Sequence, residues 1–123
     1  MENFSQLISD RITKLCGKTE AELLKFCRLQ MVVVQNESAL QICCPNPWTE
    51  KQLYECLSKS FGQLLHNMGI ERIVLNNGEN CQFYYCWDST SYVFKGYFAN
   101  GDLTKLKVVD IPTIEELENM TGN

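Results

Sequence analysis

The chain has 123 residues, of which 45% are hydrophobic and 21% are charged, so it has the composition of one globular domain over residues 1–123 and not that of a disordered segment. Its formal net charge of −4 comes entirely from an expected acidic C-terminal helix or tail, residues 110–123, which leaves residues 1–109 neutral. A neutral body is a poor electrostatic match for nucleic acid or for an anionic membrane, which argues against both as partners.

No stretch of the sequence has the length and hydropathy of a membrane span or of a signal peptide. The longest apolar run, residues 31–34, is far below the ~20 residues that cross a bilayer, and residues 1–5 contain no basic region followed by an apolar stretch. The seven cysteines of a chain without an export signal are expected to be reduced thiols, most of them buried. Together these features predict a cytoplasmic protein.

The N-terminal third of the chain predicts two helices followed by a β-hairpin. Apolar residues at steps of three and four predict an amphipathic helix over residues 4–15. Thr19 and Glu22 form a capping box, which predicts the start of a second helix. A β-branched run at residues 30–35, a polar turn and an apolar segment at residues 39–44 predict the two strands of the hairpin.

The third helix is expected over residues 50–68 as one continuous element. Thr49, with a glutamine three residues later, forms a capping box, and Trp48 and Leu53 could close it as a hydrophobic staple. Gly69 stands where a helix would end in a Schellman motif. The apolar stripe that predicts the core-facing side of this helix consists of Leu53, Leu57, Phe61, Leu64, Leu65 and Met68.

The rest of the chain predicts a β-meander and a short last helix. Strands are expected at residues 70–75, 81–87, 92–98 and 103–109, and a helix follows at about residues 114–120. The predicted order is therefore α-α-β-β-α-β-β-β-β-α. Because the connections between strands are short, we predict the α+β fold class, with a mainly antiparallel sheet and the helices packed on one face.

The sequence contains no motif of a catalytic or metal centre. Cys43 and Cys44 are adjacent, while Cys81 and Cys86 are five residues apart. Neither spacing matches the C-x2–4-C pairs of a structural zinc site. No local pattern pairs the single histidine, His66, with a thiol or hydroxyl, and no glycine pattern suggests a phosphate-binding loop. We therefore predict no catalytic residue, no metal ligand and no cofactor, and expect that the chain is not an enzyme.

The most distinctive feature is a cluster of aromatic residues, since eight of the 13 lie between residues 83 and 98. Strand alternation predicts that one face of this region covers the core and that Tyr84, Val93 and Tyr97 form an exposed strip beside Lys95 on the other face. Exposed tyrosines are typical anchors of protein interfaces, although the rings are also explained as core-filling strand formers. The core-facing rings of the second strand would be Tyr92, Phe94 and Phe98.

An apolar strand that ends in Pro-Asn before a long helix, Ala39-Leu-Gln-Ile-Cys-Cys-Pro-Asn46, resembles a segment of the N-terminal domain of the bacterial replication initiator DnaA. The predicted order of elements over residues 4–76 is also similar to that KH-like domain. The GXXG loop of nucleic-acid-binding KH domains is absent. The resemblance implies a protein-docking module that recruits partners without catalysis.

The sequence therefore predicts a non-catalytic protein-interaction module, an adaptor or regulator that binds a protein partner or a second copy of itself. The alternative is a nucleic-acid-binding domain that uses the aromatic meander or the basic residues of the first two helices. A small enzyme or ligand binder is the third hypothesis.

Overall fold

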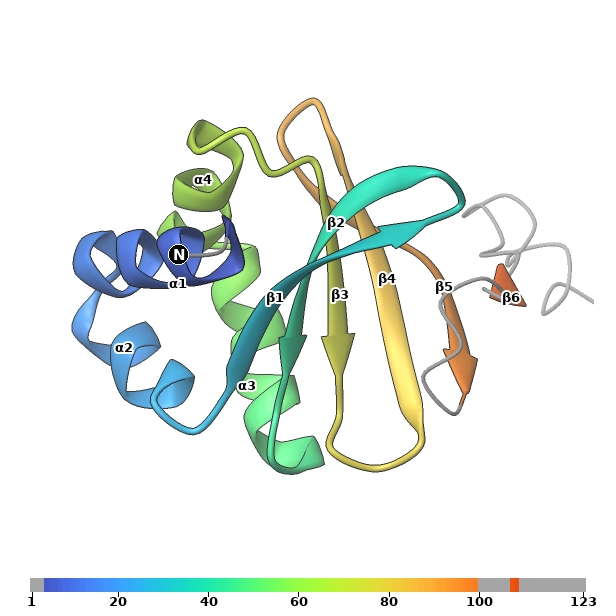
Figure 1. Cartoon of the computed structure of the whole chain (residues 1–123), viewed down its shortest axis with the longest axis horizontal. Helices are drawn as coiled ribbons and strands as arrows, with labels where there is room; N and C mark the ends of the chain where they lie inside the picture. Colours follow the sequence, from blue (N-terminus) through green and yellow to red (C-terminus); the bar gives the residue numbers. More distant parts are fainter. Residues whose placement is uncertain (1–3, 100–106, 109–123) are drawn as a thin grey trace, which may run out of the picture.

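The computed structural model describes residues 4–99 and 107–108, which form four helices and six strands (Figure 1). The elements are α1 (Phe4–Leu15), α2 (Lys18–Leu24), β1 (Arg28–Val34), β2 (Glu37–Cys43), α3 (Pro47–Leu57), α4 (Ser60–Asn67), β3 (Arg72–Asn76), β4 (Cys81–Asp88), β5 (Ser91–Ala99) and β6 (Lys107–Val108). The expected strand at 103–109 is described only in its β6 part. The expected helix at 114–120 and the acidic segment 110–123 lie outside the described residues.

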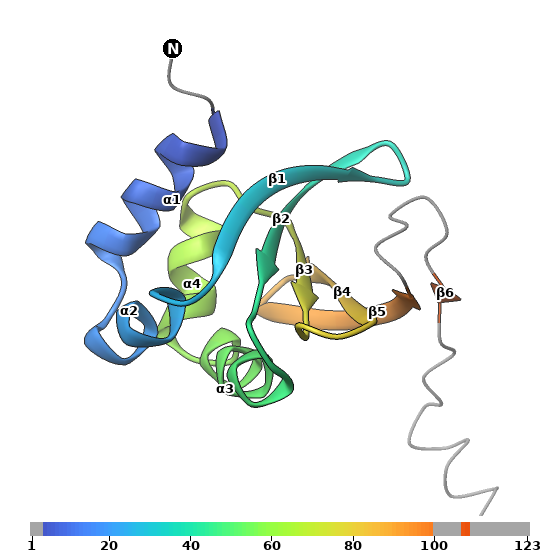
Figure 2. The same ribbon diagram turned by 60° about the horizontal axis from the view of Figure 1, so that its bottom comes forward.

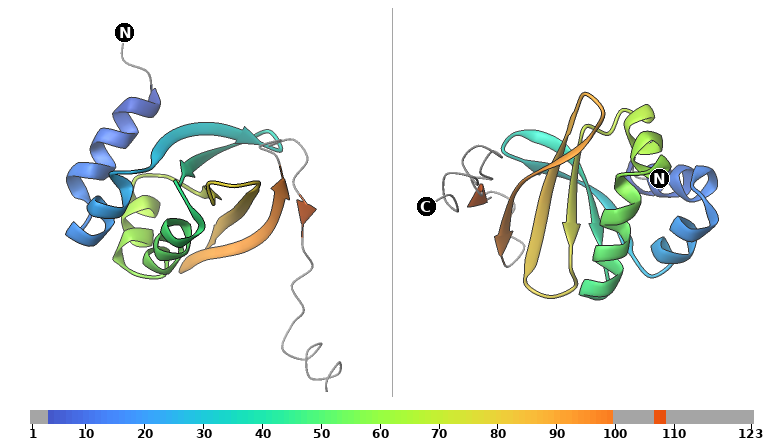
Figure 3. Two further views of the ribbon diagram at one scale, coloured as in Figure 1. Left: turned by 90° about the horizontal axis from the view of Figure 1, so that it is seen from below. Right: turned by 180° about the vertical axis from the view of Figure 1, so that it is seen from behind.

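The six strands form one sheet in the order of the sequence, β1-β2-β3-β4-β5-β6. Neighbouring strands are antiparallel except for β2 and β3, which run parallel with Leu40 opposite Ile73. α3 and α4 connect these two parallel strands, and they lie with α1 and α2 on one face of the sheet (Figure 3). The predicted α+β class, with a mainly antiparallel sheet and helices on one face, is confirmed.

The sheet buries apolar side chains on both of its faces. The larger cluster lies between the sheet and the helices and includes Ile12, Leu53, Phe61 and Leu65. A second cluster lies on the opposite face, which is concave because the β1–β2 hairpin curves over it (Figure 2). Its buried members are Val34, Ala39, Val74, Tyr84 and Phe98. Within the described ranges, no helix is long and apolar enough to cross a membrane.

The segment that was predicted as one continuous third helix forms two helices. This break is the main difference between the predicted fold and the structure. α3 ends at Leu57, and Lys59 has an extended backbone (φ −119°, ψ −155°) before α4 begins. The first turn of α4 then passes so close to the end of α3 that a Cβ on Gly62 would lie 1.9 Å from the Leu57 carbonyl oxygen. The break lets α4 turn away from the α3 axis, and only glycine fits at the contact.

The end of α4 agrees with the sequence. Gly69 has a φ of +87°, which favours glycine, and the Ile70 N–H donates to the Leu65 carbonyl at 3.1 Å. This is the predicted Schellman ending.

Two predicted helix caps are wrong. Asn46, and not Thr49, is the N-cap of α3, and its Oδ1 accepts a hydrogen bond from the Thr49 N–H at 2.8 Å, with Pro47 in the first helical position. Trp48 is 63% exposed, so it forms no hydrophobic staple. Thr19 lies inside α2, whose N-cap residue is a glycine without a side-chain cap.

Replacing Asn46 by alanine should lower the free energy of unfolding by about 1 kcal/mol, because the Thr49 N–H loses its acceptor at the start of α3. Urea denaturation of Asn46→Ala measures this loss. Asn46→Ser is the matched control, since serine also caps helices, and it should retain most of the stability. Equal losses in the two variants would contradict the capping role.

Candidate aromatic interface

Six aromatic side chains form three directly opposed pairs across β4 and β5, on the face of the sheet that carries the helices. Trp87 pairs with Tyr92, Tyr85 with Phe94 and Phe83 with Tyr97. The ring centroids are 5.1 Å apart in the first pair and 5.7 Å apart in the second, and both pairs are inclined rather than stacked. Opposed aromatic pairs of this kind stabilise an antiparallel sheet.

A β-bulge determines which of these rings share a face. Tyr84 pairs with Gly96 and Tyr85 pairs with Phe94, so Lys95 is an additional residue in β5. The extra residue reverses the alternation after Phe94. Tyr97 therefore lies on the helix side of the sheet with Phe83. Phe98 lies on the concave side, in the second cluster. The predicted common face of Tyr92, Phe94 and Phe98 is wrong for Phe98.

The predicted strip of Tyr84, Val93, Lys95 and Tyr97 is not a single surface. Tyr84 lies on the face opposite the core-facing rings, as predicted, but it is only 5% exposed, because the curved hairpin and Phe98 create a second core there. Burial and a hydrogen bond with the Cys86 side chain raise the pKa of its phenol. Val93 is half-buried and Lys95 is exposed. Tyr97 is 38% exposed and lies on the other face from Tyr84.

The exposed aromatic area lies where the helices no longer cover β4 and β5. Tyr54 of α3 is 48% exposed, and its ring centroid is 5.5 Å from that of buried Tyr85. The Phe83 and Phe94 rings are 6.4 Å apart and half-buried, and Phe83 pairs with Tyr97 across the strands. We call Tyr54, Phe83, Phe94 and Tyr97 the aromatic surface. Tyr54 was not predicted, because it lies one position from Leu53 of the apolar stripe and no spacing in the sequence links it to the meander.

His66 closes the other end of the aromatic row. Its ring stacks on Trp87 with centroids 3.9 Å apart and an interplanar angle of 9°, and its Nδ1 lies 3.7 Å from a Glu71 carboxylate oxygen. Next to it, the Tyr92 hydroxyl donates to the Ile70 carbonyl at 2.5 Å. Within the described residues, the His66 Nδ1 forms no hydrogen bond. The histidine ring packs against Trp87 of the sheet.

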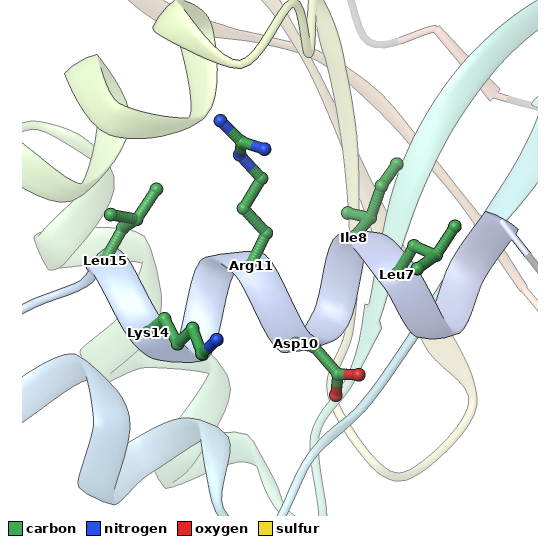
Figure 4. Close-up of a pocket in the computed structure, with 6 residues that line it drawn as sticks. All are labelled: Leu7, Ile8, Asp10, Arg11, Lys14 and Leu15. Atoms are coloured by element: carbon green, nitrogen blue, oxygen red, sulfur yellow. The ribbon is translucent and has the colours of Figure 1, made fainter.

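The described part of the chain contains no recognisable metal site. The seven cysteines are free thiols, and no group of three or more His, Cys, Asp or Glu side chains there could hold a metal ion. A hollow of 660 Å³ runs along α1 (Figure 4). Arg11 and Lys14 are the basic residues of its lining and Asp10 is the acidic one, with Leu7, Ile8 and Leu15 supplying the apolar part. None of these lining residues carries a hydroxyl, thiol or imidazole group.

The architecture and the site together define a class. The chain is an α+β protein built on one mixed sheet, and its aromatic surface lies on the helix-bearing face, over the part of β4 and β5 that the helices leave exposed. Comparisons with models of protein families, with curated proteins and with solved structures found no match to this chain.

Proposed function

We propose that the chain is a non-catalytic protein-interaction module, an adaptor or regulator, that binds a protein partner through the aromatic surface. The observation that carries the proposal is the exposure of Tyr54 and Tyr97, 48% and 38%: Tyr54 lies against the ring of buried Tyr85, and Tyr97 pairs with Phe83 across the strands. Core packing explains the buried rings beside them, but it does not explain why these two large aromatic side chains remain exposed to solvent. Tyrosines in this setting are frequent hot spots of interfaces.

The charges around the aromatic surface favour a protein partner over a nucleic acid. Lys51, one turn before Tyr54 on α3, is offset by Glu50 and Glu55 on the same helix, and Lys95 is the single basic residue of β4 and β5. Stacking of single-stranded bases on exposed rings requires basic groups that track the phosphates. A recruiting role without catalysis is also what the resemblance of residues 4–76 to the DnaA N-terminal domain implies.

The combined change Tyr54→Ala and Tyr97→Ala should weaken binding to the partner at least tenfold and leave unfolding cooperative. Each exposed interface tyrosine contributes ~1–2 kcal/mol to binding, and ~1.4 kcal/mol corresponds to a factor of ten. Proteins that co-purify with the tagged chain from its native cell would be compared quantitatively between the wild type and this variant. A protein depleted by the change would then be purified and titrated by calorimetry.

The matched control is Phe26→Ala with Leu15→Ala, which removes two exposed apolar side chains outside the aromatic surface. It should bind the partner like the wild type. A variant that loses Tyr84 is not a test of binding, because that ring is buried and its loss should destabilise the fold. Equal recovery of all partners by the Tyr54/Tyr97 variant would contradict the proposal. Tight, salt-sensitive binding of a single-stranded oligonucleotide that the variant loses would establish the nucleic-acid alternative instead.

A further inference from the structure

Two cysteines face each other at the base of the β1–β2 hairpin. Arg28, the first residue of β1, pairs with Cys43, the last residue of β2. The same antiparallel register places Cys27 opposite Cys44. Directly opposed residues of antiparallel strands have Cα atoms about 4.5–5.5 Å apart, which lies within the range that a disulfide bond requires.

The two thiols also lie on the same side of the sheet. Cys44 is a buried member of the main core, and Cys27 is half-buried and packs against that core. A hydrogen bond with the Cys44 side chain lowers the pKa of the Cys27 thiol, whereas this hydrogen bond and burial raise the pKa of Cys44. Cys27 is therefore the thiol that ionises first and the one that solvent reaches. Cys43, by strand alternation, is on the opposite face of the sheet.

We infer that Cys27 and Cys44 form a dithiol site that reacts with small-molecule disulfides of the glutathione class and closes into an intramolecular disulfide. In the first step the Cys27 thiolate attacks one sulfur of the small disulfide, whose S–S bond breaks and releases one thiolate. In the second step the Cys44 sulfur attacks Cys27 Sγ of the mixed disulfide and releases the second thiolate. The two protons of the cysteines pass to the two released thiolates, so two thiols of the chain are oxidised while one external disulfide is reduced.

The bond would covalently join two connecting segments of the fold that only non-covalent contacts hold together in the reduced chain. Cys27 lies three residues after the end of α2, and Cys44 lies two residues before Asn46, the N-cap of α3. The disulfide would fix the end of the α1–α2 helix pair to the start of α3 and enclose the whole hairpin. Because a closed loop restricts the unfolded chain, the oxidised protein should melt at a higher temperature, by about 5–15 °C.

The experiment treats the full reduced chain with oxidised glutathione at neutral pH and follows the intact mass, the thiol count and the melting temperature. The thiol count of the wild type should fall from the seven cysteines of the sequence to five, without retained glutathione. Peptide mapping should identify the Cys27–Cys44 bond. Cys44→Ser should stop at a glutathione adduct on Cys27, and Cys27→Ser should give neither the adduct at that site nor the rise in melting temperature.

Cys43→Ser is the matched control, since it changes the neighbouring cysteine on the other face and should close the disulfide as the wild type does. Peptide mapping of the oxidised wild type tests for the Cys27–Cys44 bond without any variant. The test therefore remains valid if a serine variant fails to fold. Retention of seven thiols, adducts spread over the partly exposed cysteines without an internal bond, or a bond between another pair would each overturn it.

Discussion

Replacing Gly62 by alanine should lower the free energy of unfolding by about 3 kcal/mol or more, the largest effect that we expect from adding a single methyl group. The added Cβ would lie 1.9 Å from the Leu57 carbonyl oxygen and 2.9 Å from its carbonyl carbon. Both are backbone atoms at the end of α3, so a rotamer change cannot relieve the contact. Urea denaturation followed by circular dichroism measures the loss.

Gly69→Ala is the matched control for Gly62→Ala. A Cβ on Gly69 meets no atom within 4 Å, so only its φ of +87° opposes alanine, at a cost of about 1 kcal/mol. If Gly62→Ala were no more destabilising than Gly69→Ala, the close approach of α4 to α3 would be wrong.

Replacing Leu57 by alanine should lower the free energy of unfolding by about 2–5 kcal/mol, because the side chain is buried in the main core between Leu53 and Phe61. Leu64→Ala is the matched comparison. Leu64 belongs to the same predicted stripe, but it is only partly buried and packs at the margin of the core, so its replacement should cost about half as much or less. Chemical denaturation of both variants provides the two values. Equal losses would show that the core extends over the Leu64 side of α4.

The apolar stripe of residues 53–68 was visible in the sequence, but the helix break within it was not. Leu53, Leu57, Phe61 and Leu65 keep a spacing of four on both sides of Lys59, so a continuous helix and two helices that pack on the same core give the same pattern. Gly62 was the available signal, because a glycine within an apolar helix often marks a close packing contact. The contact itself depends on tertiary structure, which periodicity does not contain.

The location of the aromatic surface could be predicted only in part. Strand alternation correctly assigned the residues of β4 to the two faces of the sheet, with Tyr84 on one face and Phe83 and Tyr85 on the other. The same alternation gave the wrong faces in β5 after Lys95. Gly96 was the signal for that irregularity, since an isolated glycine within a strand suggests a bulge. The burial of Tyr84 could not be predicted, because it depends on the curvature of the sheet and not on which face a residue occupies. The position of the aromatic cluster was thus visible in the sequence, but which of its rings are exposed was not.

The parallel pairing of β2 with β3 has a consequence for the order in which the chain can fold during synthesis. β1 and β2 pair as a hairpin, and β3, β4 and β5 pair successively with one another, whereas the second edge of β2 must wait for β3, which follows two helices. While residues 44–72 are still being translated, the edge of β2 that later pairs with β3 has unpaired backbone groups, and Leu40 and Ile42 lack the core partners from α3, α4 and β3. The nascent hairpin therefore presents an unpaired edge and an apolar face to chaperones and to other chains until Ile73 leaves the ribosome and β3 joins the two halves of the sheet.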